Sequence, residues 1–398
     1  MQAAVAARPS HAELVQRAQA MVPILEERAD ACDAAGQMPA ETVAMFEAAG
    51  FYKILQPARY GGWQHSPQVL FDVVRTLAHG CPSSAWCLSV VLIHTWEIGV
   101  MGHAMGDDIW GKDPATRASS SYNPTGKATE VDGGYRLEGR WKFSSGCDHC
   151  TWAVLGALVP APASPAGVAQ VAMFVAPGDY RIVPDTWHVL GLRGTGSKDV
   201  VVKGAFVPRH RTHAMRDIFQ IERMQQGLID AEAYRYPFRA TLSYCLSAIS
   251  LGIAEAAMAE FIAQSKGRIV AGTAGEAWKN PYVQRRMADA SALIDAAALR
   301  MDRDFADMAP YARRGEPIPA GQRMSYVWNS AYNALSMTEA VDLIYRTSGA
   351  RAVADSNPLQ RCFRDVNVIP NHVLLNADQR AADFAWIKFG GDPTAVNL

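Results

Sequence analysis

The feature that most constrains the fold is a hydrophobic period that changes twice along the 398-residue chain. Up to about residue 115, apolar residues recur every three or four positions, as on one face of an α-helix. From about Thr116 to His210 they alternate, and β-branched residues become frequent, which is typical of strands. From about Ala231 onward the helical period returns. The pattern predicts an α+β, mainly α chain with an N-terminal helical domain (1–115), a β domain (116–230) and a C-terminal helical bundle (231–398).

Capping residues mark the starts of the N-terminal helices. Ser10 and Glu13 form a capping box, in which each side chain accepts a hydrogen bond from the other's backbone. Pro67 is placed as the first residue of a later helix that ends near Gly80. The helix expected from Pro82 is apolar almost all round, so we expect it to be buried.

The β domain is predicted from several short strands at near-regular spacing, which indicate a small antiparallel barrel or sandwich. Asp132-Gly133-Gly134 is a hairpin-type turn that precedes the first of them. The predicted strands are Tyr135–Phe143, Trp152–Val159, Val168–Val175, Tyr180–Pro184 and Asp199–Val207.

The charge balance and the apolar segments narrow the functional classes. Thirty-eight basic residues face 39 acidic ones, so nothing supports a nucleic-acid binder. The most apolar stretch, Ala85–Met101, contains His94 and Glu97 and is shorter than a clean membrane span. The N-terminus lacks the pattern of a secretory signal, so we expect a soluble cytoplasmic protein without a membrane partner. The pair Cys147 and Cys150 lacks the further ligands that zinc needs, so we expect no metal site.

Four segments, in order along the chain, resemble those of the acyl-CoA dehydrogenase fold, whose plan is helices, a small β domain and a four-helix bundle. These segments resemble the loop entering the β domain, two flavin-facing segments and the start of the last active-site turn. They are Tyr122–Gly126, Gly139–Gly146, Gly191–Asp199 with Phe206-Val207-Pro208 after it, and Arg364-Asp365. The resemblance covers essentially the whole chain.

One departure from that family indicates a subgroup. Many of the dehydrogenases carry a glutamate base about seven to nine residues after Arg-Asp, whereas this chain has His372 near that position and no Glu. Pro82–Trp86, His94–Trp96 and Ser144–His149 also resemble the oxygenase components of two-component flavin monooxygenases. Known members include the 4-hydroxyphenylacetate and 3-hydroxy-9,10-secoandrostatrienedione hydroxylases.

The resemblance implies a reaction and a set of partners. Reduced FMN or FAD would react with O2 at flavin C4a, and the resulting hydroperoxide would hydroxylate a phenolic substrate ortho to its hydroxyl. No nicotinamide-binding motif is visible in the sequence, so a separate NAD(P)H-dependent reductase would supply the reduced flavin. The fold resemblance further implies a homotetramer.

The resemblance also implies roles for the residues of the catalytic and substrate sites. His372 would take the phenol proton, because imidazole titrates near neutral pH. His94 would help to hold the substrate hydroxyl, although a histidine on an apolar helix is as often a core residue. Ser120, in the run Ser119–Ser121, would bind the same hydroxyl, although such runs are usually solvated loops. Ser145 would donate to flavin N5, although the ordinary interpretation of that position is a turn at a strand end.

Five further residues are implied to bind the flavin. Trp141 would pack on the ring system, although it also fits an ordinary core position, and Ser144 would lie beside it. Thr195 and Ser197 would bind the polar edge or the phosphate. Arg268 would bind the phosphate, either of a flavin in its own subunit or of one across a subunit boundary. A solvated arginine is equally compatible with the sequence.

Three alternatives stay open. An N- or S-oxygenase of the same fold would share the flavin segments but needs no phenol base. An acyl-CoA dehydrogenase would hold oxidised FAD tightly, and the missing glutamate speaks against it. A non-enzymatic helical scaffold of this fold would bind no flavin.

Overall fold

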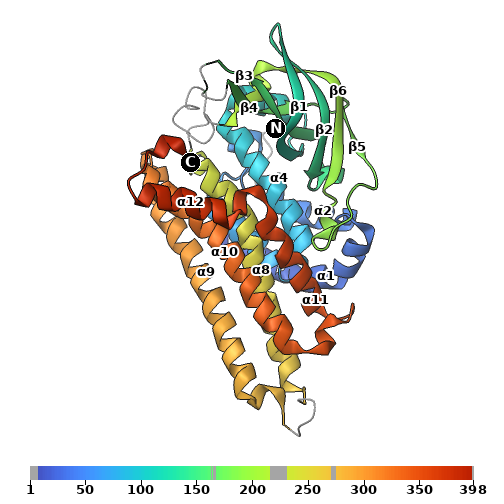
Figure 1. The fold of residues 1–398 in the computed structure, drawn as a ribbon. Helices are drawn as coiled ribbons and strands as arrows, with labels where there is room; N and C mark the ends of the chain where they lie inside the picture. The colour runs from blue at the N-terminus through green and yellow to red at the C-terminus, as the bar shows by residue number, and fades with distance from the viewer. Residues whose placement is uncertain (1–7, 163, 165–166, 216–230, 270–274, 397–398) are drawn as a thin grey trace.

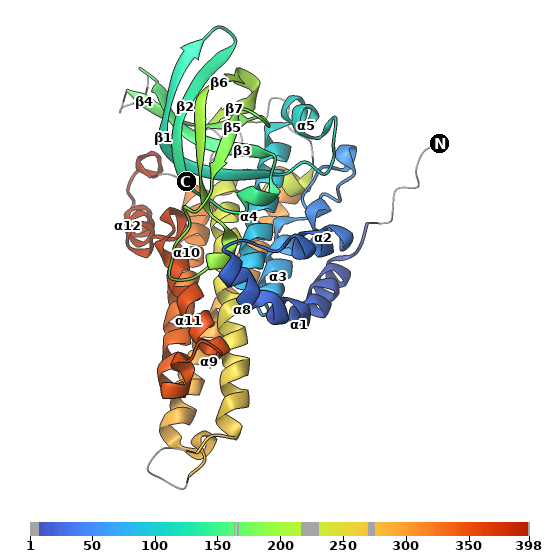
Figure 2. The same cartoon turned by 90° about the vertical axis from the view of Figure 1, so that its right-hand side faces the viewer.

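The structure, a computed structural model, describes residues 8–162, 164, 167–215, 231–269 and 275–396. Figures 1 and 2 show the β domain at one end of the molecule, above two groups of helices. The N-terminal helices lie on one side, and the long C-terminal helices extend away from the sheet on the other (Figure 2).

Five α-helices form the described N-terminal part, and the expected capping box opens the first of them. Ser10 N donates to Glu13 Oε2 over 2.5 Å, and Glu13 N donates to Ser10 Oγ over 3.2 Å. The last helix was not expected; it begins directly after Gly102, whose φ of 95° lets the chain turn. The helices are α1 (His11–Ala35), α2 (Ala40–Ala48), α3 (Pro67–Leu77), α4 (Pro82–Met101) and α5 (His103–Trp110).

Helix α4 is the central element, and the prediction that it is buried is confirmed. Only Val90 and Met101 of its 20 residues are not buried. Two of the described helices, α4 and the later helix α8 (Phe238–Lys266), are long and apolar enough to cross a membrane by length and composition. The apolar windows of α4 and α8 are 89% and 67% buried inside the protein, as in the core helices of a folded domain.

The β domain is one mixed sheet rather than a purely antiparallel one. Its strand order is β5-β6-β2-β1-β3-β4-β7, and β1 and β3 run parallel while the other neighbours are antiparallel. The turn at Gly133 joins β1 to β2 as expected, and the chain then crosses back to place β3 on the other side of β1. The strands are β1 (Ala118–Val131), β2 (Gly134–Ser144), β3 (Trp152–Pro160), β4 (Val168–Val175), β5 (Tyr180–Val183), β6 (Lys198–Pro208) and β7 (Thr212–Ala214).

The parallel pair was missed because strand β1 was not among the predicted strands. This strand contains Tyr122–Gly126, which resembled a loop, and the serine run, for which a loop was the ordinary interpretation. Its register against β3 shifts between Ser121 and Gly126, where Asn123 and Pro124 interrupt the pairing. Since proline has no N–H to donate to a neighbouring strand, such an irregularity accommodates it.

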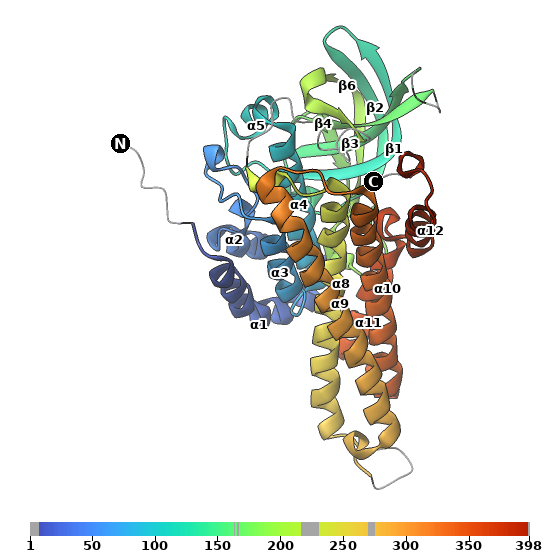
Figure 3. The same cartoon turned by 90° about the vertical axis from the view of Figure 1, so that its left-hand side faces the viewer.

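The two faces of the sheet have different neighbours. One face packs on α4 and α5, through residues such as Ala118, Trp152 and Phe174 (Figure 3). The opposite face encloses a core of its own, which includes Leu137, Trp141, Leu155 and Val200. Because successive side chains of a strand alternate between faces, Ser120 lies on the face of Ala118 and Tyr122, which is turned to α4.

The C-terminal part is the expected helical bundle. The long helices α8, α9 and α10 pack along one another with α11, while α12 packs on α10. The sequence boundary placed at 230 and 231 meets the segment 216–230, which lies outside the described residues. The helices are α8 (Phe238–Lys266), α9 (Pro281–Arg314), α10 (Ala320–Ser348), α11 (Pro358–Val368) and α12 (Ala377–Lys388).

Candidate functional site

A chain of hydrogen-bonded hydroxyl groups links the end of β2 to the Gly191–Asp199 segment. The indole N–H of Trp86, on α4, donates to Ser145 Oγ over 3.1 Å. Ser145 Oγ and Ser197 Oγ lie 2.7 Å apart, as do Ser197 Oγ and Thr195 Oγ1. Thr195 Oγ1 donates to Leu192 O over 2.8 Å. The structure thus brings together three of the residues expected to bind flavin.

Glycines allow these segments to approach α1 and α4 closely. A Cβ atom on Gly194 would lie 2.2 Å from Cys32 Sγ, which a side chain could not tolerate. Gly146 takes a left-handed φ of 67°, and its N–H donates to Thr195 O over 2.9 Å. The turn after β2 is therefore fixed directly against the segment that carries Thr195 and Ser197.

The structure places Trp141 and Ser144, both implied to lie beside the flavin, inside the protein; for Trp141 this matches the core position that the sequence also allowed. The Trp141 ring has no exposed surface, and its Nε1–H donates to Gly156 O over 2.7 Å inside the β-domain core. Ser144 is also fully buried, and its hydroxyl donates to Ser119 Oγ over 3.1 Å. Strand alternation and the register shift at the end of β2 turn both side chains into the protein.

The sequence analysis missed an exposed aromatic pair beside the same segment. Phe143 is 62% exposed and has a left-handed φ of 69°. Its ring meets that of Trp187 edge-on, with centroids 6.0 Å apart. The indole N–H of Trp187 donates to Arg193 O over 3.0 Å, which ties the pair to the hydroxyl chain. The sequence pattern gave no signal for this exposure, because alternation alone places Phe143 on the same face as Trp141.

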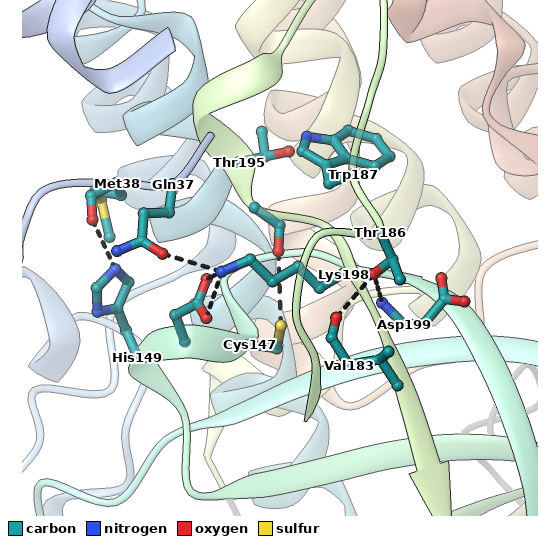
Figure 4. Close-up of polar contacts among 12 residues, drawn as sticks. Gln37, Met38, Cys147, His149, Val183, Thr186, Trp187, Thr195, Lys198 and Asp199 are labelled. Carbon is teal, nitrogen blue, oxygen red and sulfur yellow. Dashed lines mark hydrogen bonds and ion pairs between the residues drawn. The ribbon is translucent and has the colours of Figure 1, made fainter. Parts of the chain in front are cut away.

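Figure 4 shows how the Gly191–Asp199 segment is anchored to the N-terminal helical domain. Lys198 Nζ lies 2.8 Å from Asp148 Oδ1 and donates to Gln37 Oε1 over 3.0 Å. His149 Nε2 lies 2.8 Å from Met38 O, and the Cys147 thiol donates to Gly196 O over 3.6 Å. Asp148 and His149, for which the sequence suggested no role, therefore hold the loop after α1 against the Gly191–Asp199 segment.

The neighbouring strand edge is fixed in the same way (Figure 4). Thr186 Oγ1 donates to Val183 O over 2.9 Å and accepts the backbone N–H of Asp199 over 2.9 Å. Arg140 Nε donates to Asp199 Oδ2 over 2.7 Å from the adjacent strand. These hydrogen bonds fix the position of Thr186, and thereby of the neighbouring Trp187 in the exposed aromatic pair.

Arg364 and Asp365, expected to start a turn, lie within helix α11 and bind the Gly191–Asp199 segment. Asp365 Oδ1 accepts the backbone N–H of Leu192 over 2.6 Å. Arg364 donates to Leu190 O over 3.0 Å and pairs with Asp33 of α1 over 3.1 Å. Burial, and then the nearby Asp33, raise the pKa of Asp365 to about 7.

His372 lies in the turn after α11 and faces Trp86. The two rings meet edge-on with centroids 6.2 Å apart. His372 Nδ1 accepts the backbone N–H of Leu374 over 3.3 Å, and burial lowers the pKa of His372 to about 4. The imidazole is therefore neutral near pH 7, with its proton on Nε2.

His94 belongs to a buried polar cluster on the same helix as Trp86. His94 Nδ1 lies 2.8 Å from Glu97 Oε2, and His213 Nε2 lies 2.6 Å from Glu97 Oε1. The Tyr122 hydroxyl donates to Glu97 Oε2 over 2.5 Å. Ser120 precedes Tyr122 by one alternation on β1, so His94 and Ser120 lie on the facing surfaces of α4 and the sheet. Glu97 and His213 were not predicted as site residues.

Arg268 lies apart from all of these residues. Helix α8 runs away from the sheet, and its end at Lys266 is at the far tip of the bundle (Figure 1). Arg268 Nη1 donates to Thr347 O over 2.9 Å. It lines a cavity of about 380 Å³ together with Gln264, Ser348, Arg351 and Asn357. Arg268 and Ser145 could therefore bind one ligand together only if they came from different copies of the chain.

The site fits a flavin in two respects. Ser145, Thr195 and Ser197 offer hydroxyl groups that can donate or accept hydrogen bonds at a polar ring edge. Phe143 and Trp187 provide exposed aromatic surface beside them. A bound flavin would supply the chemistry with O2, while these residues would position it. Among the residues that the structure describes, no group of three His, Cys, Asp or Glu side chains could hold a metal ion.

Comparison with known proteins places this arrangement in a family. Residues 244–377 match the model of the acyl-CoA dehydrogenase C-terminal domain. The HsaA oxygenase subunit of a flavin-dependent monooxygenase from Rhodococcus jostii is 33% identical over 377 residues, which are 94% of this chain and 98% of that protein. The oxygenase component of an FADH2-dependent resorcinol hydroxylase from a Rhizobium strain is 29% identical over 96% of this chain and 95% of its own length.

A solved structure gives the same result. The 3-HSA hydroxylase from Rhodococcus sp. RHA1 superposes with a TM-score of 0.89 at 32% identity, covering 96% of this chain and 98% of that one. The agreement extends over the helical domain, the sheet and the bundle. The chain therefore belongs to the family of flavin-dependent monooxygenase oxygenase subunits, which are built on the acyl-CoA dehydrogenase fold.

Proposed function

We propose that the chain is the oxygenase component of a two-component monooxygenase that hydroxylates a phenol ortho to its hydroxyl group. The observation that carries the proposal is the meeting of two groups of residues on α4. Trp86 leads into the hydroxyl chain that ends at Thr195, and His94 leads to the buried carboxylate of Glu97. One group suits a flavin edge and the other suits a phenolic hydroxyl. The Rhizobium relative is a resorcinol hydroxylase, which supports a phenolic substrate.

The flavin would arrive reduced, as FMN or FAD, from a separate reductase. When bound, it supplies the activation of O2. Ser145 is held by the Trp86 N–H and by Ser197, so its hydroxyl is fixed beside the proposed position of flavin N5. Water would have to be kept out of this region during the reaction, because it would otherwise favour loss of the oxidant as H2O2.

The substrate hydroxyl would lie between α4, β1 and the turn after α11. His94 and Ser120 approach it from the first two elements, and His372 approaches from the third. The apolar side chains of the sheet face turned to α4 would surround the ring.

A second copy of the chain would complete the flavin site. Arg268 and Arg351 line the same cavity, and burial, and then the charge of Arg351, lower the pKa of Arg268, so an anion there would stabilise the charged form of Arg268. We propose that this cavity holds a flavin phosphate whose ring system is bound by another subunit of a homotetramer. The seven free thiols are compatible with the cytoplasmic location expected from the sequence.

The test is product formation from purified protein, reduced FMN or FAD, O2 and a panel of phenols. We expect an ortho-dihydroxylated product in proportion to the reduced flavin consumed, and none with oxidised flavin. Product from a thioether or an amine, but from no phenol, would transfer the assignment to S- or N-oxygenation. Reduction of a dye by acyl-CoA with tightly bound oxidised FAD would instead indicate a dehydrogenase.

A further inference from the structure

The buried cluster around Glu97 contains more hydrogen-bonded polar side chains than His94 would need merely to bind a substrate. Its members come from three elements: His94 and Glu97 from α4, Tyr122 from β1 and His213 from β7. All four side chains are largely or fully buried, and Glu97 has no exposed surface. Burial of a carboxylate costs free energy of folding unless hydrogen-bond donors satisfy both of its oxygen atoms.

Hydrogen bonding decides the charge of Glu97. Burial alone would raise the pKa of its carboxyl group, but the bonds from His213 and His94 outweigh that effect and lower the pKa to about 2. Burial, and then the charge of Glu97, hold the pKa of Tyr122 well above its usual value. Glu97 is therefore an anion and Tyr122 a neutral donor throughout the physiological range.

An anionic carboxylate can only accept, which fixes the proton positions on its partners. His94 Nδ1, His213 Nε2 and the Tyr122 oxygen must each present a hydrogen to Glu97. In neutral His94 the remaining nitrogen, Nε2, is then the basic one. The structure gives His94 Nε2 no hydrogen bond to any residue in the described ranges, so it is left for a ligand.

His372 has the opposite arrangement. Its Nδ1 accepts from Leu374 N, so its Nε2 carries a hydrogen and can donate but not accept. No carboxylate is bonded to it among the described residues. The resemblance to known oxygenases gave His372 the role of base, whereas its hydrogen bonds favour a donor to the substrate or to the oxidant.

We propose that Glu97, held by His213 and Tyr122, is a positioning residue that presents the basic Nε2 of His94 to the substrate, so that His94 takes the phenol proton. This inference rests on the proposed function and deepens it. The phenol O–H bond breaks, its electron pair stays on oxygen, and the proton forms the N–H bond at His94 Nε2. The resulting imidazolium lies against the Glu97 carboxylate, which stabilises it as in a catalytic triad.

Among the residues that the structure describes, few other charged or titratable groups face this cluster. Cys245 of α8 lies close enough to influence Tyr122, and burial raises the pKa of its thiol above 9. Tyr234 packs against α4 at Gly99, but its hydroxyl donates to Leu55 O. A pH effect at His94 therefore traces to Glu97, His213 and Tyr122 among the described residues.

The test compares Glu97→Gln with the wild type across pH. The amide keeps the shape but loses the charge, so we expect product formation near neutral pH to fall by at least about tenfold, within the range of general base catalysis. The loss should shrink as pH rises toward the pKa of the phenol itself, because solution then supplies the phenolate. A purely structural role would lower activity equally at all pH values.

Controls separate the charge effect from damage to the fold. Glu255→Gln is matched, since Glu255 also bonds a histidine, His79, but on the surface between α3 and α8; its pH profile should equal that of the wild type. Tyr122→Phe removes one donor to Glu97 and keeps the ring, so it should give a smaller change in the same direction. If Glu97→Gln does not fold, Tyr122→Phe serves as the test variant in its place.

A second measurement needs no turnover. 4-Nitrophenol, whose phenolate absorbs visible light, is titrated with pH in the presence of flavin-free protein. We expect the wild type to shift ionisation of the probe to lower pH and Glu97→Gln to lose that shift. Identical curves for the two proteins would overturn the inference. Failure of the wild type to hydroxylate any phenol would instead remove the proposed function, and the probe titration would still decide the role of Glu97.

Discussion

Ser145 and Ser144 are adjacent in the chain but have different surroundings. Ser145 lies between Trp86 and Ser197 at the edge of the proposed flavin site, whereas Ser144 is enclosed with Ser119 inside the β domain. The difference follows from strand geometry, because neighbouring side chains at the end of β2 point to opposite faces. This pair allows the role of a single hydroxyl to be tested against a neighbour of the same chemistry.

Replacement of Ser145 by alanine should uncouple the reaction. Loss of one hydrogen bond of about 1.4 kcal/mol corresponds to a factor of about ten in the partition between product and H2O2. The measurement is product and H2O2 per reduced flavin oxidised. Ser144→Ala is the control and should keep the wild-type ratio; an equal effect of both variants would contradict a specific role for Ser145.

Asp365 should make stability depend on pH. Its pKa is raised from 3.8 to about 7, so the folded state keeps a proton that the unfolded chain has lost. Its stabilising contribution is complete below about pH 4 and decreases by up to about 1.4 kcal/mol per pH unit until about pH 7. Asp365→Asn, which still offers an oxygen to Leu192 N, should remove this slope. Thermal unfolding of both proteins from pH 4.5 to 8 checks it, and parallel curves would refute it.

At the scale of elements, α4 and α8 determine how the two helical regions meet. Ser89 of α4 donates to Cys245 O of α8 over 2.6 Å. Gly252 of α8 lies against α3, where an added Cβ atom would lie 2.1 Å from Arg75 O and 2.9 Å from Ala78 Cβ. These close approaches keep α4 in place beneath the sheet, and α4 carries Trp86, His94 and Glu97.

Gly252→Ala should therefore destabilise the protein by about 1–3 kcal/mol, since the backbone of α3 must move to admit the methyl group. Gly321→Ala is the matched change, because this helical glycine meets only Ile387 Cγ2 at 3.6 Å. Alanine there should stabilise the helix by about 0.5–1 kcal/mol. Denaturant unfolding measures both, and destabilisation of similar size in the two variants would show that contact with α3 is not the cause.

At the scale of the whole molecule, the proposed site is divided between two opposite ends of the folded protein (Figure 1). The hydroxyl chain lies near the sheet, and Arg268 lies at the far tip of the bundle. Arg268→Ala should weaken binding of reduced flavin by about tenfold or more, as expected for a lost charge-assisted hydrogen bond. Product per bound flavin should be unchanged.

Flavin titration and sedimentation together test this arrangement. Arg346→Ala, which removes an exposed arginine paired with Asp342 on α10, serves as the control. A protein that sediments as a monomer yet binds flavin with full affinity would exclude a phosphate site shared between subunits.

The amino-acid sequence by itself determined the plan of helices, sheet and bundle, because hydrophobic periodicity and caps such as Ser10 and Glu13 act over a few residues. It also indicated the segments that hold Ser145, Thr195 and Ser197, which the structure joins by hydrogen bonds. Only the tertiary structure decided which side chains face one another. It turned Trp141 and Ser144 into the core, paired β1 with β3 in parallel, and brought His213 to Glu97 across 116 residues. The reason is physical: local patterns encode period and exposure, whereas the meeting of charges depends on how distant elements pack.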